Sequence, residues 1–91
     1  MLFRSQQVTI INKLGLHARA ASSFVKTASA FASTVQVTRA ETQADGKSIM
    51  AMMMLEATCG STITLSIDGA DEDNAMAALI EIIEERFGEA E

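Results

Sequence analysis

The chain has 91 residues, of which 48% are hydrophobic and 21% are charged, and its formal net charge is −5. This length supports a single small domain over residues 1–91, and this composition favours a folded chain over a disordered one. No apolar run reaches the roughly 18 residues of a membrane span, and the start of the chain lacks the apolar core of a secretion signal. We therefore expect a cytoplasmic protein without membrane insertion. The single cysteine, Cys59, excludes an internal disulfide and a cysteine metal cluster.

The charge is distributed unevenly along the chain. Residues 1–67 hold six basic and three acidic residues, a net of +3, whereas residues 68–91 hold one basic and nine acidic residues, a net of −8. No basic stripe or aromatic platform is present, so we expect no nucleic-acid partner. The mildly basic first part suits a phosphate or an acidic protein surface. We interpret the acidic end as a solvated helix face.

A strand, a loop and a helix are predicted first. Residues 6–11 are rich in β-forming residues and predict a strand, and residues 12–16 form a loop around a flexible glycine, Gly15. From about residue 18 to 31 the alanine content supports a helix. Its apolar residues fall at helical spacing: Ala21, Phe24, Val25, Ala28 and Phe31.

Two strands and a short helix follow. Residues 33–39 alternate, with both valines on one face, and predict a half-buried strand. A weaker strand is predicted near residues 41–44, before a turn. Ser48 is well suited to cap a short helix over residues 49–55.

The last predicted strand and helix complete the chain. Residues 61–67 alternate over their whole length, and acidic residues at 71–73 suit the start of a helix. Gly88 is predicted to end that helix. The helix has one apolar stripe: Ala75, Met76, Leu79, Ile82, Ile83 and Phe87. The order β-α-β-β-α-β-α predicts an α+β fold, an open-faced two-layer β-sandwich in which three helices cover one face of a four-stranded antiparallel sheet.

The only histidine, His17, lies where the loop becomes the helix, in the segment Gly15-Leu16-His17-Ala18-Arg19-Ala20-Ala21. A helix start offers free N–H groups and the positive end of the macrodipole, so it suits an anion. The same dipole favours a neutral, nucleophilic imidazole over an imidazolium. We hypothesise that His17 carries a phosphoryl group, that Arg19 contacts it, and that Ala18 and Ala20 belong to the cradling helix start.

Other interpretations of His17 are weighed against this one. A lone histidine near a helix start is often a surface or capping residue. A catalytic triad is excluded, because the sequence has no nucleophile-elbow pattern and no acidic residue at a helpful spacing from His17. A single histidine without cysteines or nearby acids makes a poor metal site, so we expect no metal and no cofactor.

The segment around His17 resembles the active-site motif of the HPr family, the histidine-containing phosphocarriers of the phosphoenolpyruvate-dependent phosphotransferase system. Residues 47–55 resemble its second motif and residues 68–72 its C-terminal part, so the resemblance spans essentially the whole chain. It implies an open-faced β-sandwich with four antiparallel strands and three helices. It also implies that His17 Nδ1 accepts a phosphoryl group from phosphorylated enzyme I and passes it to a histidine of an enzyme IIA protein. Arg19 then contacts the phosphate.

Two features bear on the type of relay. Ala20 stands where the family usually has proline; alanine is compatible with a helix start and returns an N–H donor, so we expect activity to survive. The loop over residues 11–15 resembles the nitrogen-related NPr branch more than the enteric sugar branch. A sugar-uptake and a nitrogen-regulatory system both stay open.

Ser48 matches the serine that a dedicated kinase phosphorylates in many family members, and phosphorylation there adds about −1.5 to −2 charge. The alternative is a serine that only caps the helix. We expect Ile49, Met50 and Met53 to form an outward patch for docking partners, because methionine adapts to several surfaces. The alternative is that most of the methionines fill core gaps, as we expect for Met52.

The leading hypothesis is a monomeric phosphoryl carrier, not a stand-alone enzyme. Its partners are enzyme I, an enzyme IIA protein and a serine kinase or phosphorylase. The alternatives are a non-catalytic interaction module of the same fold and a small-ligand regulatory domain.

Overall fold

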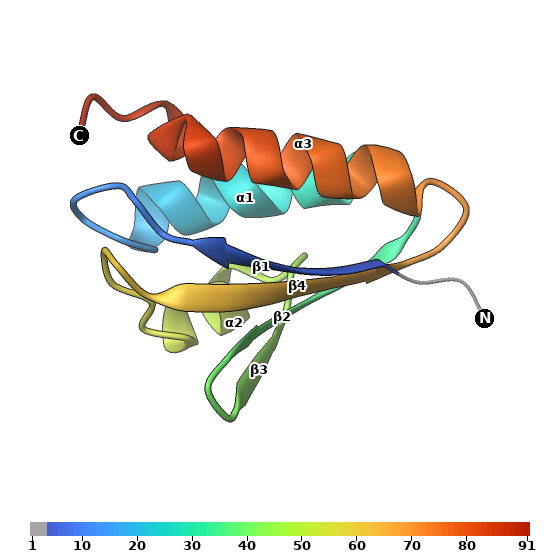
Figure 1. Cartoon of the computed structure of the whole chain (residues 1–91), viewed down its shortest axis with the longest axis horizontal. Coiled ribbons are helices and arrows are strands. Elements are labelled where there is room, and N and C mark those ends of the chain that lie inside the picture. The colour runs from blue at the N-terminus through green and yellow to red at the C-terminus, as the bar shows by residue number, and fades with distance from the viewer. Residues whose placement is uncertain (1–3) are drawn as a thin grey trace.

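The computed structural model describes residues 4–91 and has the predicted α+β architecture (Figure 1). Its elements in chain order are β1 (Arg4–Thr9), α1 (Ala18–Ser29), β2 (Thr34–Arg39), β3 (Thr42–Asp45), α2 (Ile49–Met54), β4 (Thr62–Asp68), α3 (Glu72–Glu84) and the 3₁₀ turn η1 (Arg86–Gly88). The strands form one antiparallel sheet in the order β1-β4-β2-β3. The predicted four-stranded antiparallel sheet is confirmed.

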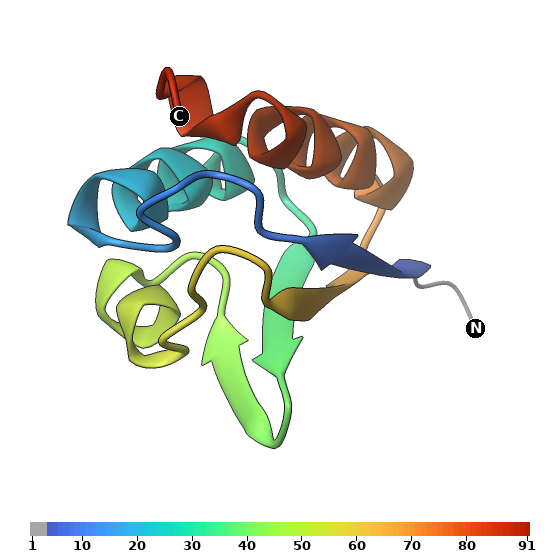
Figure 2. The ribbon, with the colours of Figure 1, turned by 60° about the vertical axis from the view of Figure 1, so that its left-hand side comes forward.

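Two layers result from the alternating pattern of the strands. The helices α1 and α3 lie side by side along the sheet, and α2 packs beneath the start of α1, next to β3 (Figures 1 and 2). The apolar residues of β4 and β2 are buried in the core: Ile63, Leu65, Ile67, Val35 and Val37. Phe24 of α1 is also fully buried, and burying such a side chain contributes about 1.5–3 kcal/mol.

Asp71, at the start of α3, connects that helix to the segment between α1 and β2. Its carboxylate accepts the N–H of Ala32 at 2.8 Å and the N–H of Ser33 at 2.9 Å, and the Ser33 hydroxyl donates a further hydrogen bond. The Ser33 hydroxyl and the Ala32 N–H lower the pKa of Asp71 below its usual 3.8. The charged form of Asp71 therefore joins elements that are far apart in the sequence.

The predicted bounds of two early elements require correction. The strand predicted over residues 6–11 is displaced to Arg4–Thr9. Ile10 then leaves the ladder and is fully buried, and its N–H donates to Ser61 O at 2.8 Å. The helix predicted to reach residue 31 ends at Ser29, so Phe31 packs against the core from outside the helix.

The end of the last helix also differs from the prediction. Helix α3 stops at Glu84, and Arg86 and Phe87 have left-handed φ values of 56° and 55°. Phe87 therefore does not extend the helical stripe, and it reaches the core through the turn η1. Gly88 lies inside this turn and does not itself end the helix. The turn directs the last residues back toward the loop before α1 (Figure 1).

Candidate phosphoryl-acceptor site

The loop before α1 has its shape because residue 15 is glycine. Gly15 has φ +69°, and a Cβ atom there would lie 2.6 Å from Ala57 O and 2.9 Å from Thr58 Cα. No other residue fits this close approach in this conformation. The next residue, Leu16, is buried and its N–H donates to Ala57 O at 2.9 Å. These contacts place His17 at the N-cap of α1.

The start of α1 leaves donors free for an anion. The first helical hydrogen bond runs from Ala21 N–H to His17 O at 2.8 Å, and the His17 side chain makes no capping bond. Within residues 4–91 the preceding N–H groups of Ala18, Arg19 and Ala20 have no acceptor. Three unpaired donors at the positive end of a helix form an anion-binding arrangement.

The His17 ring is anchored by a residue that the sequence did not indicate. Its Nε2 atom makes a short contact with the carboxylate oxygen Oε2 of Glu89, 72 residues away in the sequence. No partner within residues 4–91 contacts Nδ1, and the His17 side chain is 29% exposed. No acidic residue lies at a helpful spacing from His17 in the sequence, but the turn after α3 returns Glu89 to the loop.

Asn12 holds this carboxylate in place. It is fully buried, and its Nδ2 donates to Gly15 O at 2.8 Å and to Glu89 Oε1 at 2.9 Å. The hydrogen bond from Asn12 lowers the pKa of Glu89 below its usual 4.5, and the hydrogen bond from His17 and the charge of Arg19 act in the same direction. Glu89 is therefore ionised near neutral pH. The acidic end of the chain is not only the solvated helix face that its composition indicated.

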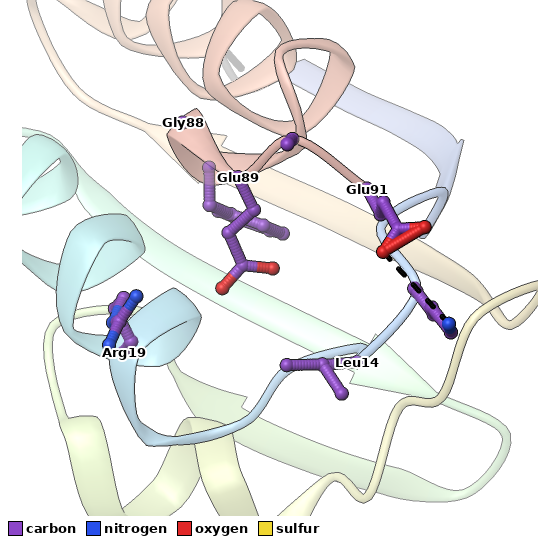
Figure 3. A pocket seen from close by; sticks show the side chains of 8 residues that line it. Leu14, Arg19, Gly88, Glu89 and Glu91 are labelled. Carbon is purple, nitrogen blue, oxygen red and sulfur yellow. Dashed lines mark ion pairs between the residues drawn. The ribbon is translucent and has the colours of Figure 1, made fainter.

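A pocket of about 490 Å³ lies beside the start of α1 (Figure 3). Arg19 and Leu14 border it on one side and Glu89 on the other, with the Glu89 carboxylate pointing toward the helix start. Lys13 pairs with Glu91 across its rim at 3.9 Å. Arg19 is exposed and has no hydrogen-bond or ion-pair partner within residues 4–91, so its guanidinium is available to a bound anion.

The predicted residues around α2 occupy two environments. Ser48 caps the helix by accepting the Ala51 N–H at 3.2 Å, which confirms the capping prediction. Met52 is buried, as expected, and Leu55 is buried as well. The remaining large apolar side chains of α2 are exposed: Ile49, Met50, Met53 and Met54. The first three are the residues expected in the docking patch, and Met54 was not predicted to belong to it.

Among residues 4–91 no group of three or more histidine, cysteine, aspartate or glutamate side chains is arranged to hold a metal ion. No helix within that range is long and apolar enough to cross a membrane.

A free imidazole nitrogen on the N-cap residue of a helix with unpaired N–H groups is the arrangement that we expect of a phosphoryl acceptor. A family model described as "PTS HPr component phosphorylation site" matches residues 4–85. The chain belongs to the HPr family. The phosphocarrier protein HPr of Neisseria meningitidis serogroup A is 55% identical over 86 residues, which cover 94% of this chain and 97% of that protein. A crystal structure of HPr from Thermoanaerobacter tengcongensis has a TM-score of 0.92 at 42% identity and covers 97% of this chain and 99% of that one.

This HPr-family protein is thus a phosphocarrier of the phosphotransferase system, a phosphoryl carrier and not an enzyme. Membership of the family implies enzyme I and enzyme IIA as partners. The phosphocarrier protein NPr of Shewanella violacea is 42% identical over 85 residues, below the 55% of the Neisseria HPr. Identity over the whole chain therefore favours HPr over the NPr branch that the loop at residues 11–15 resembles.

Proposed function

We propose that His17 Nδ1 is the atom that accepts the phosphoryl group from phosphorylated enzyme I and passes it to a histidine of an enzyme IIA protein. One observation carries this proposal. The unpartnered Nδ1 belongs to the N-cap residue of α1, which directly precedes the unpaired N–H groups of Ala18, Arg19 and Ala20, while Glu89 holds the other ring nitrogen. The helix start favours a neutral ring before transfer and stabilises the dianionic phosphoryl group afterwards.

Labelling with enzyme I and radioactive phosphoenolpyruvate tests this assignment. We expect the wild-type chain to be labelled, and the label to be lost in acid and stable in base, as for a phosphoramidate. His17→Ala is expected to fold normally and to carry no label, because the histidine is half-exposed and contributes no cap to α1. A base-labile label, or full labelling of His17→Ala, would place the phosphoryl group elsewhere. A wild-type chain that takes no label would instead favour the non-catalytic interaction module.

We also propose that α2 presents the docking surface for these partners. Ile49, Met50 and Met53 are exposed on α2, and α2 lies beneath the start of α1 that carries His17 (Figure 2). An exposed apolar group of this kind marks an interaction site. Ser48 borders this surface at its N-terminal end, so phosphorylation there by a serine kinase adds negative charge at its edge.

Two further expectations complete this proposal. We place the carrier in the cytoplasm, where we expect it to meet enzyme I and an enzyme IIA protein. We also expect it to act as a monomer. Sedimentation at working concentration tests the monomer.

A further inference from the structure

The side of the His17 ring opposite Nδ1 faces a carboxylate held in a defined orientation. The two oxygens of Glu89 contact different donors, Oε2 facing His17 Nε2 and Oε1 accepting from Asn12 Nδ2 at 2.9 Å. The Glu89 side chain is only 14% exposed. Residue 89 lies outside the range 4–85 that matches the family model, so that match assigns it no part in the reaction.

This arrangement determines which ring nitrogen carries the proton. An ionised carboxylate only accepts hydrogen bonds, so His17 Nε2 donates to Glu89, and in the neutral ring Nδ1 then keeps the lone pair. The orientation of the Asn12 amide is determined as well, because its Nδ2 faces two acceptors, Gly15 O and Glu89 Oε1. Asn12 Oδ1 is buried with no hydrogen-bond partner within residues 4–91, and turning the amide over would place this oxygen against both acceptors.

We propose that Glu89, oriented by Asn12, is a positioning residue for phosphoryl transfer that keeps the proton of His17 on Nε2. This inference rests on the proposed function, in which Nδ1 is the acceptor. In the step into the carrier, the Nδ1 lone pair forms the bond to phosphorus while phosphorus separates from its carrier atom on enzyme I, which keeps that electron pair. The Nε2 proton stays on His17, so the ring becomes a cation beside the Glu89 carboxylate.

The same contact assists the step out of the carrier. When the phosphoryl group moves to an enzyme IIA histidine, the electron pair of the P–N bond returns to Nδ1 and the ring leaves as neutral imidazole. This requires that Nε2 has kept its proton, because a ring without it would leave as an anion. Positioning and charge stabilisation dominate phosphoryl transfer, so a carboxylate at Nε2 is expected to act on both steps.

Glu89→Gln tests the proposal at the level of the proton. A glutamine has one acceptor oxygen, and the Asn12 N–H takes it, so the glutamine NH₂ faces His17 Nε2 and favours a proton on Nδ1. We expect the ¹⁵N shifts of the imidazole near neutral pH to change from the Nε2–H tautomer to the Nδ1–H tautomer. Transfer from enzyme I is expected to slow about tenfold or more, because a charge-assisted contact and the required lone pair are both lost.

Glu84→Gln is the matched control, because it removes the same charge near the end of α3, where the exposed Glu84 side chain has no hydrogen-bond or ion-pair partner within residues 4–91 and does not line the pocket. We expect wild-type tautomer and transfer rate in this variant. A Glu89→Gln variant that keeps the wild-type tautomer would overturn the proposal, even if its transfer were slow. A variant with an altered tautomer and a wild-type transfer rate would also overturn it. The tautomer is read without enzyme I, so a failure here is distinguishable from a chain whose His17 takes no label.

Discussion

At the scale of single residues, the site combines buried supporting residues with an exposed arginine. Asn12 and Gly15 are buried and shape the loop, whereas Arg19 is exposed and unpaired within residues 4–91. Ala20, which stands where the family usually has proline, is buried in the first turn of α1 and adds a free N–H there. The helix begins at Ala18 without the preset φ of proline, because the Gly15 turn and the Leu16 anchor already set the entry of the chain.

Arg19→Ala is expected to slow transfer without reducing stability. Its guanidinium has no partner within residues 4–91 to lose, but it borders the pocket beside the acceptor. Loss of one charge-assisted contact to the phosphoryl group costs about 1.5–3 kcal/mol, or roughly ten- to a hundredfold in rate. Stopped-flow transfer from enzyme I measures the effect. Lys26→Ala, which removes an exposed charge near the other end of α1, is the control. Equal rates in both variants would remove Arg19 from the mechanism.

At the scale of elements, α1 and α2 have different tasks. The start of α1 supplies N–H donors and the macrodipole, whereas α2 is a short helix with one buried side, at Met52, and an exposed methionine-rich side. A helix of six residues is too short to be stable alone, so α2 is held by its Ser48 cap, by burial of Met52, and by Arg39, which donates to Leu55 O at 3.2 Å. The apolar side chains that stabilise α2 are therefore not the ones it exposes.

Met50→Glu is expected to weaken binding to enzyme I several-fold at least, because a carboxylate in an apolar contact is desolvated without a partner. Met50 is 73% exposed, so the free energy of unfolding is expected to change by no more than about 0.5 kcal/mol. Ser48→Asp is expected to act in the same direction more mildly. Calorimetric binding and melting on one sample measure both quantities. Gln36→Glu, on the exposed face of the sheet, controls for added charge. A Met50→Glu variant that unfolds, or binds normally, would contradict the docking assignment.

At the scale of the whole molecule, acidic side chains connect segments that are distant in sequence. Asp71 joins α3 to the chain before β2, and Glu89 joins the last residues to the loop before α1. Both carboxyl groups have lowered pKa values, and in both the first cause is a side-chain hydrogen bond, from Ser33 and from Asn12 respectively. Most of the acidic residues after residue 67 lie in helix α3 or next to it, but Asp71 and Glu89 connect distant segments of the fold.

The lowered pKa of Asp71 predicts acid sensitivity of a defined sign. The Asp71 carboxylate binds a proton more readily in the unfolded chain than in the folded one, because its pKa is lower in the folded chain. The contribution of Asp71 to stability is therefore complete above its ordinary pKa of 3.8. It is lost as the pH falls through the lower pKa of the folded chain. We expect Asp71→Asn to lower the free energy of unfolding at pH 7, and this difference to shrink as the pH falls below 3.8. Urea unfolding at a series of pH values measures it. Asp73→Asn is the control, since its pair with Arg4 is exposed. A difference that stays constant with pH would refute the assignment.

The sequence by itself determined the parts of this protein that depend on local order. Alternation placed the β4 core residues, helical spacing placed Phe24 inside, and the segment from Gly15 to Ala21 predicted that His17 lies at the start of a helix. Each of these features involves residues close together in the chain, where periodicity and turn chemistry are informative.

Only the tertiary structure decided what surrounds the acceptor. The contact between His17 and Glu89 spans 72 residues, and it depends on left-handed backbone at Arg86 and Phe87, which are neither glycine nor asparagine. Burial of Phe87 against the assembled core supports that turn, so its conformation follows from packing and not from local preference. Local patterns place each residue on a face of its own element, but the proton on His17 depends on which distant carboxylate the completed fold brings against it.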